Sequence, residues 1–231
     1  MLSETGMLDS SPVSTPMNFS TKFHADGEPF SDPTTSRKLI GKLIYLTNTI
    51  PDITFAINHL SQYLSSPTKE HYQTVFRILR YLKGTIGQGI FFDAKSDVQI
   101  QAYGDSNWAS CIDTRRSVTG YLIYLGNTLI NWRSKKQNTI SRSSFEAEYR
   151  ALSQNVCEVQ WFAYLMHDLN IPILQPTVIF CDNASTIKIV NNLVFYERTK
   201  HIEIDCYTIR EKIQQGLVKL LPVKIPNISF R

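Results

Sequence analysis

The order of strand-like and helix-like patterns over residues 97–223 restricts the fold to few classes. DVQIQAYGD alternates as a half-buried strand does, and two β-rich runs, RSVTGYLIYLG and NTLINWRSKKQ, meet at the hairpin signal Gly126-Asn127. A helical stretch over about 144–170, the short apolar run PTVIFCD, helical stretches over 184–192 and 199–215, and the strand-like GLVKLLPV follow. This order predicts an α/β domain in which a mixed five-stranded sheet is flanked by helices.

The first 96 residues have a different character. Residues 1–36 are rich in Ser, Thr and Pro and lack periodicity, which predicts an irregular or extended lead-in. Residues 37–96 carry apolar residues at helical spacing, broken at Pro51, with a further helix between Pro67 and Gly84. The sequence therefore predicts a small helical segment ahead of the sheet domain over 97–223, and a short tail over 224–231.

Composition permits several partners without requiring one. The chain has 231 residues, of which 42% are hydrophobic and 19% charged, so most of it is expected to fold. The net charge of +4 permits a polyanionic partner such as nucleic acid. The four cysteines form no C-x-x-C pair, and neither a signal peptide nor an 18-residue apolar run is found. These features predict an intracellular chain with buried, reduced thiols.

Three acidic residues lie where strands and a helix begin or end. Asp105 and Asp182 each end an apolar, strand-like run, and Glu148 lies about one turn into the long helix. Carboxylates at the tips of buried strands are costly unless they hold a metal ion or another partner. Three converging carboxylates are what a two-metal nuclease needs to position the attacking and leaving oxygens of a phosphoryl transfer.

The long helix offers two glutamates, and its start separates their roles. Ser143 and Glu146 form an S-x-x-E capping box, which gives Glu146 a structural role. Glu148 shares a helix face with Phe145 and Leu152, and that face is expected to pack on the sheet. Glu148 is therefore a candidate metal ligand. The alternative is a salt bridge to a nearby arginine at the edge of the core.

Long motifs in a fixed order identify the family that the chain resembles. YGDSNWASCIDTRRSVTGYLIYLG, LINWRSKKQNTISRSSFEAEYRAL, VIFCDNASTI and ERTKHIEID resemble the ribonuclease H domain in the Pol polyprotein of copia-type LTR retrotransposons. TGMLDSSPVSTPMN, LIGKLIYLTNTIPDITFAINHLSQYL and HYQTVFRILRYLKGT resemble the connection segment that follows the reverse transcriptase in the same polyproteins. The resemblance covers nearly all residues up to about Val223.

The resemblance implies a fold and an activity. It implies a ribonuclease H-like domain over 97–223 that cuts the RNA strand of RNA–DNA hybrids with two Mg²⁺ ions, for which Mn²⁺ can substitute. Asp105, Glu148 and Asp182 match the metal-binding carboxylates of the family. The implied partners are the hybrid and the rest of the polyprotein, including its polymerase domain, and no membrane. The implied location is the cytoplasm, in virus-like particles, or the nucleus.

Further residues are weaker candidates for the site. His201 and Asp205 belong to the RTKHIEID motif. Asp205 is either a further metal ligand or part of an ion-pair network with Arg198, and His201 is either a proton carrier or a buried imidazole. Trp108 either stacks on the substrate or lies in the core. The candidates for nucleic-acid contacts, which could equally be solvated or capping side chains, are Arg115, Arg116, Arg133, Lys135, Lys136 and Asn183.

The chain departs from the family pattern at several points. Asn107 stands where the family has a second Asp, Ile50 stands where it has an Arg, and no Tyr-x-Asp-Asp polymerase motif is present. After LPVKIPNISFR the family would continue with a helix that carries a fourth carboxylate. Two hypotheses follow: a ribonuclease H-type endonuclease, or a truncated remnant that is catalytically weak or inactive and at most binds nucleic acid. Without that helix, the apolar side chains that it would cover stay exposed to water. This loss of buried apolar surface predicts weak or absent activity in the isolated chain.

Overall fold

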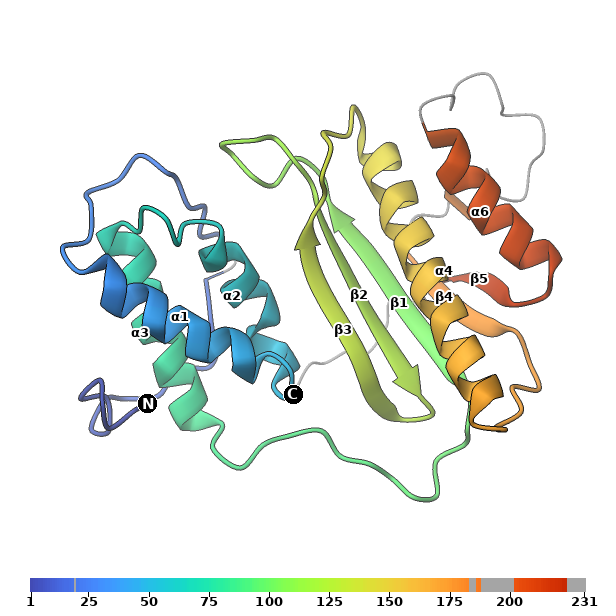
Figure 1. Ribbon diagram of the computed structural model, residues 1–231, viewed down its shortest axis with the longest axis horizontal. Helices are drawn as coiled ribbons and strands as arrows, with labels where there is room; N and C mark the ends of the chain where they lie inside the picture. Colours follow the sequence, from blue (N-terminus) through green and yellow to red (C-terminus); the bar gives the residue numbers. More distant parts are fainter. Residues whose placement is uncertain (19, 183–185, 188–201, 224–231) are drawn as a thin grey trace. The chain divides into compact units, whose positions relative to one another are not determined.

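The chain folds as two compact units (Figure 1). The computed structural model describes residues 1–18, 20–182, 186–187 and 202–223. The first unit comprises Met1–Phe91 with Cys111–Arg115, and the second comprises Phe92–Ser110 with Arg116–Arg231. Each unit has a hydrophobic core of its own. The main division falls between Phe91 and Phe92, whereas the sequence pattern placed the domain start at residue 97.

The first unit is helical, as the sequence predicted for most of its length. Its elements are α1 (Pro33–Leu46), a short 3-10 helix (Pro51–Ile53), α2 (Thr54–Ser61) and α3 (Lys69–Gly84). The prediction that the irregular lead-in extends to residue 36 was wrong, because α1 begins four residues earlier. The carboxylate of Asp32 accepts a hydrogen bond from the Thr35 amide at 3.0 Å, and Pro33 supplies a preset φ at the first helical position.

The lead-in before α1 is held in place by basic side chains of α3. Arg77 donates a hydrogen bond to the Thr15 hydroxyl at 2.9 Å, and Arg80 donates one to the Ser11 carbonyl at 2.6 Å. A segment without regular secondary structure is thereby ordered by side chains that satisfy its polar groups. These two arginines have a structural role.

A buried histidine makes the stability of the first unit depend on pH. His71 is 1% exposed, stacks on Tyr63 with ring centroids 4.2 Å apart, and accepts a hydrogen bond from the Thr68 amide at 3.0 Å. Burial, reinforced by the nearby His59, lowers the pKa of His71 from 6.5 to about 4. Because the folded-state pKa lies below the unfolded value, this contribution to stability is present above pH 6.5 and is lost as the pH falls toward 4.

We therefore expect the first unit to lose about 3 kcal/mol of unfolding free energy between pH 7 and pH 4 through His71 alone. Chemical denaturation at a series of pH values measures this loss. The His71→Gln variant should show a much flatter pH dependence, whereas His24→Gln, a change at an exposed histidine, should keep the wild-type slope. Equal slopes for the wild type and His71→Gln would contradict the assignment.

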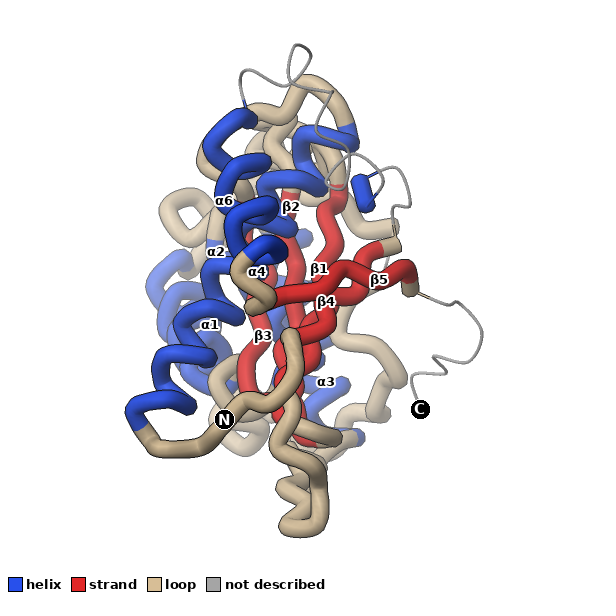
Figure 2. The backbone as a smooth tube through the Cα atoms, turned by 90° about the vertical axis from the view of Figure 1, so that its right-hand side faces the viewer, coloured by secondary structure: helices blue, strands red, loops and turns tan. Residues whose placement is uncertain are grey.

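The second unit contains the mixed five-stranded sheet that the sequence predicted (Figure 2). Its strands are β1 (Ile100–Asn107), β2 (Val118–Leu125), β3 (Thr128–Lys136), β4 (Thr177–Cys181) and β5 (Val218–Pro222). The sheet order is β3-β2-β1-β4-β5; β1, β2 and β3 are antiparallel, and β4 is parallel to both β1 and β5. The predicted hairpin at Gly126 is confirmed, since Gly126 has a φ of 57° between β2 and β3.

The helices α4 (Ser144–Asp168) and α6 (Glu203–Gln214) pack beside this sheet. The long helix α4 contacts β1 and β2, and α6 packs on α4. The core between sheet and helices includes Ile100, Ala102 and Val156. The prediction that all four cysteines are buried was wrong at Cys157, because it falls on the outward stripe of α4 and is exposed.

Gly104 allows α4 to lie close to β1. A Cβ atom on Gly104 would lie 2.7 Å from the Nδ2 atom of Asn155, a residue of α4 that is fully buried. Because Asn155 has no solvent to move into, a side chain on Gly104 would push strand and helix apart. The close approach sets the separation of the elements that carry Asp105 and Glu148.

We expect Gly104→Ala to lower the unfolding free energy of the second unit by about 1–3 kcal/mol, measured by denaturant titration. Adding Asn155→Ala in the same chain should restore part of this loss, because it removes the clashing amide. Gly120→Ala is the matched control on β2, where a new Cβ would meet the Arg133 carbonyl at an ordinary 3.9 Å. A loss at Gly120 equal to that at Gly104 would count against the packing argument.

Candidate metal and nucleic-acid site

The parallel pairing of β1 with β4 brings two of the three predicted carboxylates to adjacent strand ends. Tyr103 lies opposite Phe180 in this ladder, and their rings stack with centroids 4.8 Å apart. Asp105 and Asp182 each follow two residues later, so they lie at about the same level just beyond the paired part of these neighbouring strands. Both side chains are exposed. The pair therefore forms an accessible acidic edge at the carboxyl ends of β1 and β4.

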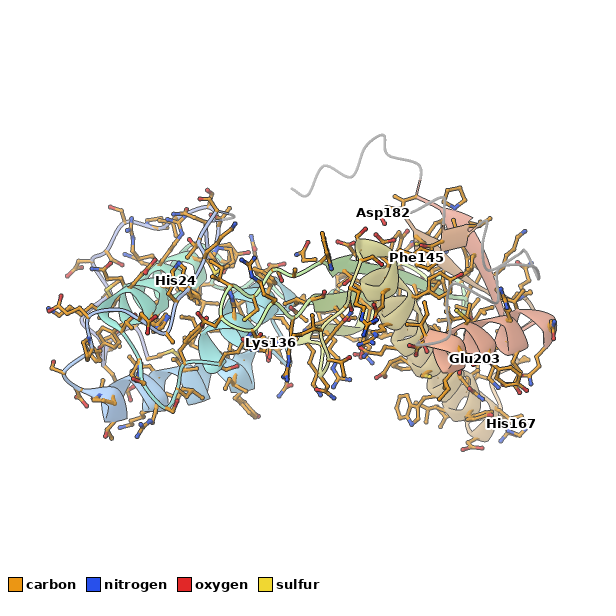
Figure 3. All side chains as sticks on the ribbon, turned by 90° about the horizontal axis from the view of Figure 1, so that it is seen from above. His24, Lys136, Phe145, His167, Asp182 and Glu203 are labelled. Atoms are coloured by element: carbon orange, nitrogen blue, oxygen red, sulfur yellow. The ribbon has the colours of Figure 1, made fainter. Side chains whose placement is uncertain are left out.

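Glu148 contacts Thr186, which lies four positions after Asp182 in the sequence; Asp182 is labelled in Figure 3. The Thr186 hydroxyl donates a hydrogen bond to Oε2 of Glu148 at 3.2 Å. Thr186 is fully buried, and its carbonyl accepts a hydrogen bond from the Tyr149 hydroxyl at 3.4 Å. These two bonds hold Thr186 against the second turn of α4.

Glu146 has the structural role that the capping box predicted. Its Oε2 atom accepts a hydrogen bond from the Arg142 amide at 2.7 Å, and its Oε1 atom pairs with the Arg150 guanidinium at 2.6 Å. The Ser143 hydroxyl accepts a hydrogen bond from the Glu146 amide at 3.2 Å. With its side chain 3% exposed, Glu146 forms the salt bridge at the edge of the core that was the alternative role for Glu148.

The fit of these residues to a metal ion rests on their donor atoms. All three side chains offer carboxylate oxygens, the ligands that Mg²⁺ and Mn²⁺ prefer. The side chains of Asp105 and Asp182 are exposed. In the described part of the chain, however, no group of three or more His, Cys, Asp or Glu side chains is arranged to hold a metal ion. A metal site formed by Asp105, Glu148 and Asp182 stays a prediction.

Asp205 faces α4. It lies in the first turn of α6, where the Ser153 hydroxyl hydrogen-bonds its carboxylate and the charges of Arg150 and Glu146 are near. Burial raises the pKa of Asp205 above its usual value. These contacts favour a role in the packing of α6 on α4. His201, Asn183 and Arg198 lie outside the described residues.

The predicted basic residues separate into two groups. Arg133 pairs with Glu158 of α4 at 3.4 Å, which favours a structural role, and Arg115 belongs to the segment assigned to the first unit. Lys135 and Lys136 end β3, and Arg116 precedes β2. The ladder aligns Ser106, Thr119 and Lys135 across β1, β2 and β3. Lys135, Lys136 and Arg116 therefore lie toward the end of the sheet that carries Asp105.

Trp108 lies directly beyond β1 and is 50% exposed. Its indole N–H donates a hydrogen bond to the Ser141 carbonyl at 3.0 Å, which fixes the ring. Of the two sequence alternatives, this exposure favours an aromatic surface near the acidic edge over a core position. Thr186 was not predicted as part of the site, because nothing in the sequence marks it except its place four positions after Asp182.

The sheet order and the positions of the acidic residues match one known architecture. A sheet in the order β3-β2-β1-β4-β5, with acidic residues at the ends of β1 and β4 and a third on α4, is the arrangement of a ribonuclease H-like domain.

Relatives of the chain identify its family, although no protein-family profile matches it. It is 43% identical over 224 residues to the retrovirus-related Pol polyprotein from transposon RE1 of Arabidopsis thaliana, covering 96% of this chain and 15% of that protein. It is 36% identical over 185 residues to the corresponding polyprotein from transposon TNT 1-94 of Nicotiana tabacum, covering 80% and 14%. The chain belongs to the Pol polyproteins of copia-type retrotransposons and spans 15% of the RE1 relative's length.

Solved structures show weaker likenesses. LC11 ribonuclease H1, isolated from compost, gives a TM-score of 0.42 at 18% identity, covering 56% of this chain and 86% of that chain. A foamy viral protease–reverse transcriptase in complex with double-stranded DNA gives 0.49 at 11% identity, covering 92% and 39%. At these scores neither structure adds to the assignment. No helix among the described residues is long and apolar enough to cross a membrane.

Proposed function

We propose that this chain is the ribonuclease H part of a retrotransposon Pol polyprotein and cuts the RNA strand of RNA–DNA hybrids by metal-dependent hydrolysis. The observation that carries the proposal is the shared level of Asp105 and Asp182 on adjacent parallel strands. The hydrogen bond from Thr186 to Glu148 adds the third carboxylate to the same end of the domain. Two strand-end carboxylates with a third on a helix are the donors that a two-metal phosphoryl transfer requires.

The residues of the chain divide the work of such a reaction. Asp105, Glu148 and Asp182 would hold two Mg²⁺ ions, which supply an activated water and stabilise the departing oxygen when bound. Arg116 and Lys135, at the same end of the sheet, would neutralise backbone phosphates. Hybrid recognition also requires contacts to 2′-hydroxyl groups in a shallow minor groove, which exposed polar side chains at strand ends can provide.

The proposed partners follow from this activity and from the family. The substrate is an RNA–DNA hybrid, and the remaining polyprotein supplies the polymerase that produces it. The proposed place of action is a virus-like particle in the cytoplasm, or the nucleus.

A second function is favoured by one observation. Arg116, Lys135 and Lys136 lie toward one end of the sheet, where they can contact nucleic acid whether or not the chain cuts it. A non-catalytic remnant would bind nucleic acid through these basic residues and cut nothing.

Cleavage of an end-labelled RNA–DNA hybrid by the purified chain, with Mg²⁺ or Mn²⁺, separates the two functions. The nuclease proposal predicts that the RNA strand is cut, the DNA strand stays intact, and duplexes of RNA or of DNA alone are not cut. Glu148→Gln should abolish cleavage, whereas Glu70→Gln, at an exposed glutamate of α3, should not. Hybrid binding without cleavage under either metal would favour the remnant.

A further inference from the structure

A single buried amide connects the strand of Asp105 with the helix of Glu148. Gln137 directly follows β3 and is 4% exposed. Its Nε2 atom donates hydrogen bonds to the Ala147 carbonyl at 2.9 Å and the Thr119 hydroxyl at 3.1 Å, and lies 3.5 Å from the Ser106 hydroxyl. Its Oε1 atom accepts a hydrogen bond from the Ser141 hydroxyl at 3.0 Å. Every polar atom of the side chain is thus engaged.

The partners of Gln137 are the immediate neighbours of two proposed metal ligands. Ser106 follows Asp105, and its amide donates a hydrogen bond to Oδ1 of Asp105 at 2.6 Å. Ala147 precedes Glu148 in the first turns of α4. One side chain therefore reaches both elements from a third element that contributes no ligand.

The position of Gln137 itself is fixed. Its backbone amide donates a hydrogen bond to the Ser117 carbonyl at 2.8 Å, which extends the pairing of β2 and β3 by one residue. A buried amide with all its donors and acceptors satisfied has one favourable orientation, because any rotation leaves a buried group unpaired. Gln137 can therefore act as a rigid spacer between the end of β1 and the start of α4.

We propose that Gln137 is a positioning residue that sets the separation of the Asp105 and Glu148 carboxylates. The inference rests on the proposed function, since the separation matters only if both carboxylates serve one site. Gln137 touches neither carboxylate and acts through Ser106 and Ala147. Partners of this kind, one step removed from a ligand, typically change metal affinity or activity by about 10–100-fold when they are replaced.

The test uses Gln137→Glu in the full chain. Glutamate keeps the size of the side chain and an acceptor for Ser141, but it replaces the Nε2 donor with an oxygen that the Ala147 carbonyl repels. We expect kcat on an RNA–DNA hybrid and the affinity for Mn²⁺, measured by calorimetry without substrate, each to fall about 10–100-fold. KM should stay within about twofold, because no proposed phosphate contact changes.

Two further variants separate positioning from general stability. Gln154→Glu makes the same change at an exposed position of α4 and should leave kcat and Mn²⁺ affinity unchanged. Gln137→Leu removes all the side-chain hydrogen bonds without introducing a repelled oxygen, and it should reproduce the loss. Wild-type kcat and Mn²⁺ affinity in either folded Gln137 variant would overturn the proposal, as would a loss in Gln154→Glu of the same size.

Amide hydrogen exchange tests whether Gln137 couples β1 to α4 even if the chain neither cuts hybrid nor binds Mn²⁺. In Gln137→Leu, exchange should become faster at residues 105–107 and at 145–148 together, while amides elsewhere in the second unit keep wild-type rates. Unchanged or uniformly faster exchange would overturn the proposal. A wild-type chain that neither binds Mn²⁺ nor cuts hybrid would defeat the proposed function, and the exchange result would still decide whether Gln137 couples the strand to the helix.

Discussion

Asp105→Asn should reduce cleavage of an RNA–DNA hybrid by at least about a thousandfold. Asparagine keeps the shape of the side chain and removes its negative charge. A metal site supplies several kcal/mol of transition-state stabilisation, and each 1.36 kcal/mol is worth a factor of ten in rate. Asp105 is the acidic residue of β1, the strand next to the one that Asp182 follows. No other described carboxylate on β1 can take its place. Single-turnover cleavage with saturating Mg²⁺ measures the effect.

The control for this experiment is Asp168→Asn. Asp168 ends α4, and its side chain is 78% exposed, so the same chemical change there should leave the rate within about twofold of the wild type. Asp105→Asn should also keep the wild-type unfolding midpoint, because the side chain is exposed. A variant that keeps a tenth or more of the wild-type rate would show that Asp105 is not a metal ligand.

Glu146→Ala should cause the largest loss of stability among single substitutions in the second unit, about 3 kcal/mol. The substitution leaves the partly buried Arg150 guanidinium without its partner, and breaking a buried ion pair from one side costs about 3–5 kcal/mol. We take the lower end of this range because the Arg150 side chain keeps 19% of its exposure to water. The Arg142 amide also loses its acceptor at the start of α4.

Denaturant unfolding of the second unit checks this prediction, with Glu148→Ala as the matched control two residues along the same helix. Glu148 is half-buried and accepts one hydrogen bond from Thr186, so its removal should cost clearly less. Glu146→Ala should therefore lose more stability than cleavage activity. Glu148→Ala should lose more cleavage activity than stability. Equal unfolding free energies for both would refute the separation of their roles.

Local patterns made much of the fold predictable. The S-x-x-E box at Ser143 fixed the start of α4 because the contacts of a capping box lie within one turn. The alternation of DVQIQAYGD and the turn at Gly126 placed β1, β2 and β3 for the same reason. The error at the start of α1 was also local, since Asp32 followed by Pro33 is a helix start within a Ser-, Thr- and Pro-rich stretch.

The site could be predicted only in part, because its supporting contacts join distant parts of the chain. Asp105 and Asp182 were visible as acidic residues after apolar runs, and Glu148 by the helix face that it shares with Phe145 and Leu152. The partner of Arg133 is Glu158, 25 positions away on α4, and no periodicity reveals such a pair. Thr186 reaches Glu148 across 38 positions in the same way. Long-range polar contacts depend on how the elements pack, and no short segment of sequence determines that packing.

Affinity cleavage of the protein by bound Fe²⁺ would report which residues surround a metal ion. Fe²⁺ replaces Mg²⁺ at oxygen-donor sites, and with ascorbate and peroxide it cuts the polypeptide next to the place where it is bound. We expect three groups of cuts, near Asp105, Glu148 and Asp182, which excess Mg²⁺ suppresses and Asp105→Asn abolishes. Cuts at none of these places, or at only one of them and unchanged in Asp105→Asn, would contradict a site built from the three carboxylates.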